Sequence, residues 1–110
     1  MKHLLTLLLF ISTQATAETF AGDGAVTIYS NTNCGDWLDA RKKDSSNARI
    51  LENRVVGFLD GLSYGLGFDV WEKPTPIVPS QLFYMVDNEC RNDPSKKTQQ
   101  VLADIYDKRR

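Results

Sequence analysis

The chain has two cysteines, Cys34 and Cys90, whose positions lie 56 residues apart in a sequence of 110 residues, from 34 to 90. An oxidised pair would force the segments around both residues to lie side by side. In the chain-entropy model, closing a loop of this length contributes about 4 kcal/mol to the free energy of unfolding. Small domains have as little as about 5 kcal/mol in total. A disulfide would therefore decide whether this chain folds.

Residues 1–17 indicate the compartment in which such a disulfide forms. A basic start at Lys2 is followed by the apolar run LLTLLLFI and by the small-residue sequence ATA that ends at Ala17. This is the pattern of a cleavable signal peptide, and it predicts cleavage before Glu18. The alternative, a membrane anchor, is disfavoured because the run is shorter than the roughly 20 residues that span a bilayer. We expect a periplasmic protein, in which an even pair of cysteines forms one disulfide.

The mature chain is expected to be one domain, with an extended lead-in over residues 18–32 and a helical domain over residues 33–110. Export removes one of the 13 basic residues and none of the 14 acidic ones, which leaves a net charge of −2. This balance does not indicate the excess of basic residues that is typical of nucleic-acid-binding proteins. The only histidine, His3, leaves with the signal peptide. We therefore expect no metal, no cofactor and no membrane insertion after cleavage.

Apolar residues recur at helical spacing in four segments, which predicts a small all-α, four-helix domain with one disulfide between helices. In the first helix, this spacing turns Cys34 and Trp37 inward together. The first three expected helices run from Asn33 or Cys34 to Lys43, from Ala48 to Leu66, and from a cap at Ser80 to Asn92. The fourth starts from a cap at Asp93, with Pro94 at the first helical position. Its inner face is expected at Thr98, Val101, Leu102, Ile105 and Tyr106.

The second expected helix carries an unusual line of glycines, Gly57, Gly61 and Gly65, spaced four residues apart. Each glycine inside a helix costs up to about 1 kcal/mol relative to alanine, so the line needs a compensating reason. We interpret it as the place where another helix approaches closely. A phosphate-binding loop is disfavoured, since it needs glycines between a strand and a helix. The apolar stripe of this helix is predicted at Leu51, Val55, Phe58, Leu62 and Leu66.

The segment from Gly67 to Pro79 is predicted to be a loop, because three prolines interrupt any helix there. It is unusually apolar for a connection. Two interpretations stay open: a lid that packs on the core, or an exposed surface that binds a partner. The candidate partner-binding residues are Phe68, Trp71, Ile77 and Val78.

Catalysis is not expected. Two carboxylates could in principle form an acid and base pair, but charged residues make up 25% of the chain and close pairs arise by chance. Asp60 and Asp87 are interpreted as solvated helix residues, and Ser63 and Tyr64 have no local base to activate a nucleophile. The carboxylates considered are Glu52, Asp60, Asp69, Asp87 and Glu89.

Three short motifs occur in a fixed order: Cys34-x-x-Trp37, Gly57-Phe58-x-x-Gly61 and Cys90-Arg91-Asn92-x-Pro94. Over roughly residues 33–106 this pattern resembles the Rap and Tai immunity-protein family, and more loosely the HdeA-like periplasmic acid-stress chaperones. Both are small exported helical proteins with a disulfide between helices. The resemblance implies that the six motif residues determine the fold: Cys34, Trp37, Gly57, Gly61, Cys90 and Pro94.

What the resemblance implies about function is protein binding. An immunity protein occludes a toxin delivered into the periplasm, whereas an HdeA-like chaperone opens in acid and coats unfolding clients. The expected partner is therefore another protein, either a toxin or an unfolding client. A second copy of the chain is a further partner that the sequence leaves open.

Overall fold

The computed structural model describes residues 31–110, so the expected signal peptide and the lead-in up to residue 30 lie outside the described residues. Its helices, in chain order, are α2 (Cys34–Lys43), α3 (Ser46–Leu66), α4 (Pro79–Asn92) and α5 (Thr98–Arg109). Residues 31–110 contain no strand, and their one β-bridge joins Asn33 to Lys97. The predicted all-α fold with four helices is confirmed.

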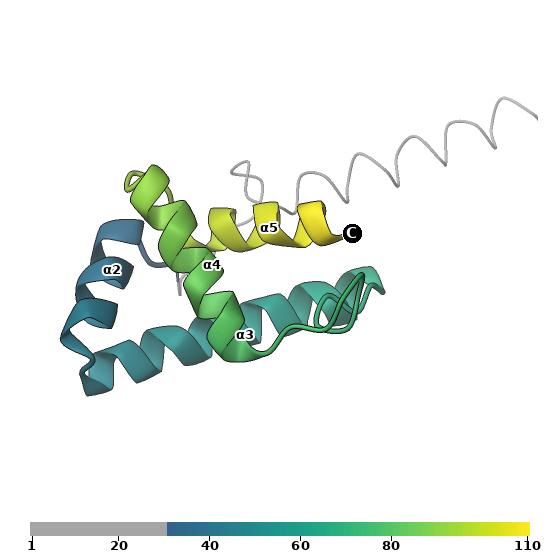
Figure 1. The fold of residues 1–110 in the computed structure, drawn as a ribbon, viewed down its shortest axis with the longest axis horizontal. Helices are drawn as coiled ribbons and strands as arrows, with labels where there is room; N and C mark the ends of the chain where they lie inside the picture. The colour runs from purple at the N-terminus through teal and green to yellow at the C-terminus, as the bar shows by residue number, and fades with distance from the viewer. Residues whose placement is uncertain (1–30) are drawn as a thin grey trace, which may run out of the picture.

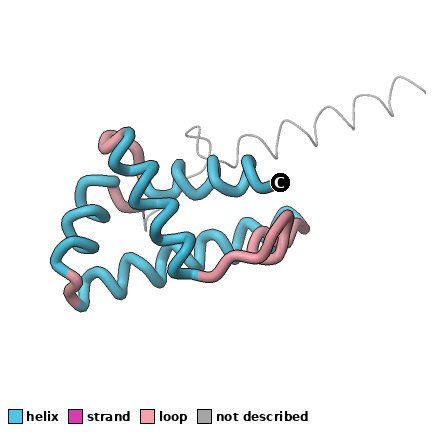
Figure 2. The backbone as a smooth tube through the Cα atoms, viewed as in Figure 1, coloured by secondary structure: helices cyan, strands magenta, loops and turns pink. Residues whose placement is uncertain are grey.

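The long helix α3 lies along one edge of the molecule (Figure 1). It packs against α2 and α5, while α4 crosses the molecule and packs against the same two helices. Figure 2 shows the loop from the end of α3 folding back along the molecule to the start of α4. No described helix is long and apolar enough to cross a membrane.

The disulfide joins the first turn of α2 to the last turn of α4, as predicted. The two sulfurs of Cys34 and Cys90 are 2.10 Å apart and the Cα atoms 5.0 Å apart. Both residues are fully buried. The same end of the molecule is held by backbone bonds, since the Cys34 N–H donates to the Lys96 carbonyl at 2.9 Å and the Thr98 N–H to the Thr32 carbonyl at 2.7 Å.

Two predicted helix starts are wrong. Ser80 does not cap α4, because Pro79 already lies in the first turn, where its missing N–H costs nothing. The Val78 N–H is satisfied by the Gln81 side chain at 2.9 Å.

The second error concerns Asp93 and Pro94, which form a turn before α5 instead of starting it. An oxygen of Asp93 accepts from the Ser95 N–H at 3.2 Å and from its hydroxyl at 2.6 Å. The hydroxyl bond is the main cause that lowers the pKa of Asp93. The side chain that would cap a helix is therefore used by the turn, and α5 begins only at Thr98.

The core draws on every helix and on one loop residue, Val70. The apolar stripe of α3 is corrected at two positions: Leu59 is fully buried, whereas Phe58 is half-buried and Leu66 is 38% exposed. Leu59 lies on the side of α3 opposite to the solvent, so its side chain is at the centre of the buried stripe. The largest fully buried side chains are Trp37, Tyr106, Leu59, Leu82, Leu102, Val55, Val70, Val86 and Val101.

The glycine line of α3 does not serve as a contact between described helices, so that interpretation is wrong. Gly57, Gly61 and Gly65 are exposed. A methyl group built at each of the three would meet nothing within 4 Å among the described residues. The glycines face outward because the apolar stripe on the opposite side of the helix holds α3 on the core.

Because these glycines are exposed, replacing them with alanine should stabilise the domain. Gly57→Ala and Gly61→Ala should each raise the free energy of unfolding, by up to about 1 kcal/mol, because alanine favours the helix and has room there. Urea unfolding of the mature protein measures the change. Gly67→Ala is the matched control and should destabilise, since its φ of +73° strains any residue with a side chain. A loss of stability in Gly57→Ala would mean that another group packs on that position.

Candidate protein-binding surface

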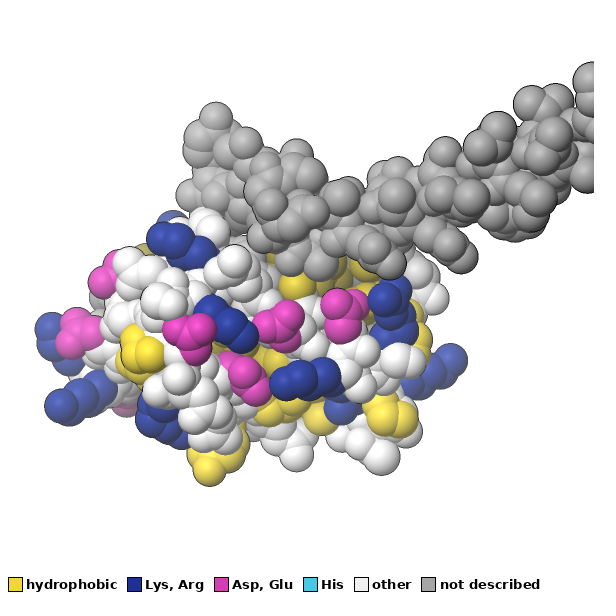
Figure 3. Space-filling view, turned by 90° about the horizontal axis from the view of Figure 1, so that it is seen from above, with side chains coloured by type: hydrophobic (Ala, Val, Ile, Leu, Met, Phe, Trp, Pro, Cys, Tyr) yellow, Lys and Arg dark blue, Asp and Glu magenta, His cyan; other side chains and the backbone are white. Residues whose placement is uncertain are grey.

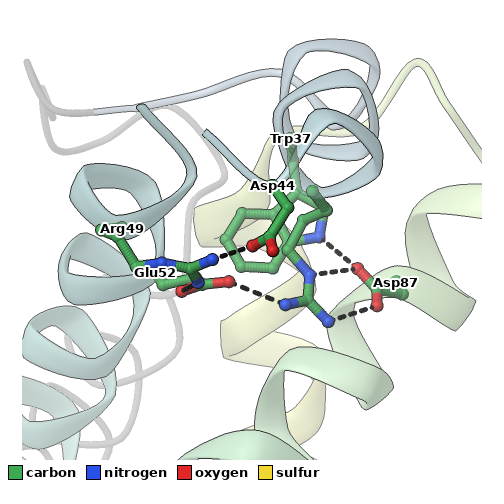
Figure 4. A network of polar contacts seen from close by, with 6 residues as sticks. Trp37, Asp44, Arg49, Glu52 and Asp87 are labelled. Atoms are coloured by element: carbon green, nitrogen blue, oxygen red, sulfur yellow. Dashed lines mark hydrogen bonds and ion pairs between the residues drawn. The ribbon is translucent and has the colours of Figure 1, made fainter. Parts of the chain in front are cut away.

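The main polar feature of the molecule is a network centred on Arg41 of α2 (Figure 4). The Arg41 guanidinium donates to both oxygens of Asp87 on α4, from Nε at 3.1 Å and from Nη2 at 2.8 Å. It also donates from Nη1 to Glu52 of α3 at 2.7 Å. The Trp37 indole N–H completes the set by donating to Asp87 at 2.8 Å. Three helices are thus joined through one arginine.

The network includes a second arginine, and two aromatic rings lie against the Arg41 guanidinium. Arg49 donates to Glu52 and to Asp44, the residue that ends α2. The Arg41 guanidinium lies over the ring of Trp37 at 5.6 Å and over the ring of Phe83 at 5.5 Å. The hydrogen bond to Asp87 is the largest cause that raises the pKa of Arg41. The arginine stays charged and serves as a fixed counterion.

Among the candidate catalytic carboxylates, Asp87 differs from its prediction. It was expected to be solvated, yet it and Glu52 are buried, with 9% and 5% of their surfaces exposed. Their oxygens accept from groups that hold helices together, which is a structural role. Asp60 is exposed, as expected. Within residues 31–110, no three His, Cys, Asp or Glu side chains gather in a way that could hold a metal ion.

The loop after α3 is docked on the helices by specific bonds. Arg109, at the end of α5, donates from Nε to the Val70 carbonyl at 2.8 Å and from Nη2 to the Thr75 carbonyl at 2.5 Å. The Val70 N–H donates to the Ser63 hydroxyl at 3.3 Å, and the Val70 side chain is fully buried. Val70 therefore acts as the anchor of this loop.

The four predicted partner-binding residues do not share one exposed face. Phe68 is half-buried and meets the Tyr106 ring edge-on, with centroids 5.8 Å apart. Trp71 and Ile77 are also half-buried, and only Val78 is exposed, at 54%. The Tyr106 hydroxyl is buried without a hydrogen-bond partner among the described residues, and this burial raises its pKa.

Among residues 31–110, the most exposed aromatic side chain is on α3 instead. Tyr64 is 94% exposed, and it lies one turn beyond Asp60, whose carboxylate accepts from the Trp71 indole N–H at 2.7 Å. Gly57 and Gly61 lie on the same side of the helix, at the spacing that lines up with Tyr64. We call the surface formed by Gly57, Asp60, Gly61, Tyr64 and Trp71 the outer face of α3.

Tyr64 was not among the predicted binding residues, although the sequence held a signal for it. Gly57, Gly61 and Tyr64 follow one another at intervals of four and three residues, opposite the apolar stripe. That spacing places a large aromatic residue on the side of the helix that faces solvent.

The surface seen in Figure 3 has no large patch of charges of one sign. Figure 3 shows acidic and basic side chains interspersed over one face, with small hydrophobic areas between them. This pattern gives a broad surface little preference for nucleic acid or for an anionic membrane. The exposed large hydrophobic residues are Ile50, Tyr64, Leu66, Val78 and Tyr84.

No family model, curated protein or solved structure matches this chain.

Proposed function

We propose that the chain is an exported, periplasmic protein-binding domain without catalytic activity, and that it contacts its partner through the outer face of α3. The observation that carries the proposal is the 94% exposure of Tyr64. Tyrosine and tryptophan dominate the energetics of protein interfaces, because each supplies a large contact area with few rotatable bonds. An exposed tyrosine one turn from Asp60, which accepts from the Trp71 indole, is a suitable anchor.

The glycines support the same proposal. Gly57 and Gly61 weaken the helix and gain no contact from the described residues in return. A flat strip without side chains lets the backbone of a partner come close to α3. On this account, the contact that the glycines serve is made with another molecule. The resemblance to immunity proteins favours a toxin as that molecule and a stoichiometric complex at neutral pH.

A binding role without catalysis is also supported by how the buried polar groups are used. Asp87 accepts from Trp37 and twice from Arg41, and Glu52 accepts from Arg41 and Arg49. A general acid or base must be free to exchange a proton with a substrate. These carboxylates are instead held in charge-assisted bonds between helices.

One observation favours the alternative, an HdeA-like chaperone activated by acid. Glu52 and Asp87 are buried counterions of Arg41, so ion pairs hold three helices together. In strong acid the net charge of the mature chain would turn from −2 to strongly positive, and self-repulsion destabilises a compact state. The disulfide would then hold an opened chain together. This alternative predicts client protection in acid only.

The test of the proposed surface compares two exposed tyrosines. Tyr64→Ser should reduce capture of the partner from periplasmic extract at neutral pH by at least about 30-fold in affinity, the size of a strong interface anchor. Tyr84→Ser is the matched control, since Tyr84 is 62% exposed on α4, and its effect should be small. Both variants should keep the melting temperature of the parent, because neither side chain packs in the core.

Three other results have definite meanings. Equal capture by the parent and by both tyrosine variants would contradict the proposed surface. Capture in acid alone would support the chaperone alternative, and recovery of a second copy of the chain would identify a homodimer.

A further inference from the structure

A cleft of about 520 Å³ lies between α2 and α4, away from the outer face of α3. Leu38 and Lys42 form its α2 side, one helical turn apart, and Asp87 and Arg91 form its α4 side, also one turn apart. Arg41 completes the lining. Clefts of about 300–1,000 Å³ are typical of binding sites, so this one has room for a short peptide segment.

The charges in the cleft do not cancel. Arg41 is already neutralised by Asp87 and by Glu52 behind it. Lys42 forms no ion pair with any described residue. Arg91 meets only the neutral side chain of Asn88. Two uncompensated cations therefore stand at the cleft, although residues 31–110 as a whole carry 12 basic and 12 acidic side chains.

We propose that this cleft is a second contact surface, which receives a short acidic segment of the partner protein. The inference rests on the proposed protein-binding function and names the chemistry of one part of the partner. A carboxylate can bind between Lys42 and Arg91, where no carboxylate of the described chain competes for either cation. The Leu38 side chain offers an apolar wall for a neighbouring residue of the segment. The Asp87 carboxylate is paired with Arg41, so it is not the ion-pair partner of Lys42 or Arg91.

The charges also predict how the contact behaves. Exposed ion pairs are weak one by one, and they are screened by salt. The cleft should therefore bind an isolated acidic peptide weakly and with strong salt dependence. Within a full complex, the same cations would speed association by attracting the acidic partner.

The test uses the mature protein labelled with ¹⁵N and two capped peptides, acetyl-Leu-Glu-Leu-Glu-amide and acetyl-Leu-Gln-Leu-Gln-amide. The glutamate peptide should shift the backbone amide signals of residues 38–42 and 87–91 saturably, and at least tenfold more tightly than the glutamine peptide. Lys42→Glu combined with Arg91→Glu should weaken binding at least tenfold. Lys43→Glu is the control, since Lys43 is next in sequence but pairs with Asp39 outside the cleft, and it should change affinity less than twofold.

Several results would overturn the inference. They are the absence of saturable shifts at millimolar peptide, equal binding of the two peptides, and shifts that lie outside α2 and α4. Free sodium glutamate that binds as tightly as the peptide would also overturn it, because the cleft would then be a site for small anions. Tyr64→Ser should leave peptide binding unchanged, so a failure of this inference is distinguishable from a failure of the proposed α3 surface.

Discussion

Replacing both cysteines with alanine is expected to lower the free energy of unfolding of the mature domain by about 4 kcal/mol. The bridge closes a loop of 56 residues and joins α2 to α4, so its loss frees the unfolded chain far more than the folded one. A small domain has little stability to lose. We therefore expect the Cys34→Ala, Cys90→Ala variant to be largely unfolded at about 37 °C.

Circular dichroism during urea unfolding measures this effect on the oxidised parent, the reduced parent and the alanine variant. Alanine is preferable to serine because both positions are fully buried, and a hydroxyl there would lack a partner. The reduced parent should behave like the alanine variant. A loss of less than about 1 kcal/mol would show that the helices hold without the bridge, contrary to our account of the scaffold.

Arg41→Met is expected to destabilise the domain by about 3 kcal/mol at neutral pH. Removing the guanidinium leaves Asp87 and Glu52 buried without their main counterion, and breaking a buried ion pair on one side costs about 3–5 kcal/mol. We take the lower end because the Arg41 side chain is 27% exposed. Arg41→Lys should recover only part of the loss, since lysine cannot donate to both oxygens of Asp87 in the arginine geometry.

A double-mutant cycle separates this network from simple packing. In an Asp87→Asn background Arg41 has lost an ion-pair partner, so Arg41→Met should cost less there than in the parent. Arg54→Met is the control, because Arg54 is exposed and pairs with no carboxylate of the described chain. Its effect should stay within about 0.5 kcal/mol. An equal loss from Arg41→Met in both backgrounds would assign its effect to lost contact area.

The sequence was sufficient for the helices and their bridge, because both depend on local signals. Apolar spacing located α2 and α3 to within two residues, and an even pair of cysteines in an exported chain has one simple outcome. The errors at Ser80 and Asp93 have a local cause. Pro79 takes the first position of α4, so its N-cap is Val78, two residues before Ser80, and the Asp93 side chain bonds to Ser95 in a turn instead of capping α5.

The polar network around Arg41 and the docking of the loop after α3 were less predictable because they depend on residues that are distant in the sequence. The bond from Trp37 to Asp87 joins positions 50 residues apart, and the bond from Arg109 to the Val70 carbonyl joins positions 39 apart. Contacts between residues so far apart cannot be predicted from helical periodicity. The sequence alone therefore predicts Asp87 in solvent. The glycine line was recognised, but its direction was not, because glycine gives no hydropathy signal that distinguishes a buried side from an exposed one.

The most direct test of the account places a photoreactive residue, p-benzoylphenylalanine, at position 64 or at position 84 of the exported chain in cells of its own species. Illumination followed by mass analysis counts the adducts formed with other proteins. We predict one dominant adduct with a single partner from position 64 and little from position 84. Equal adducts from both positions, or none from position 64, would contradict a binding role for the outer face of α3.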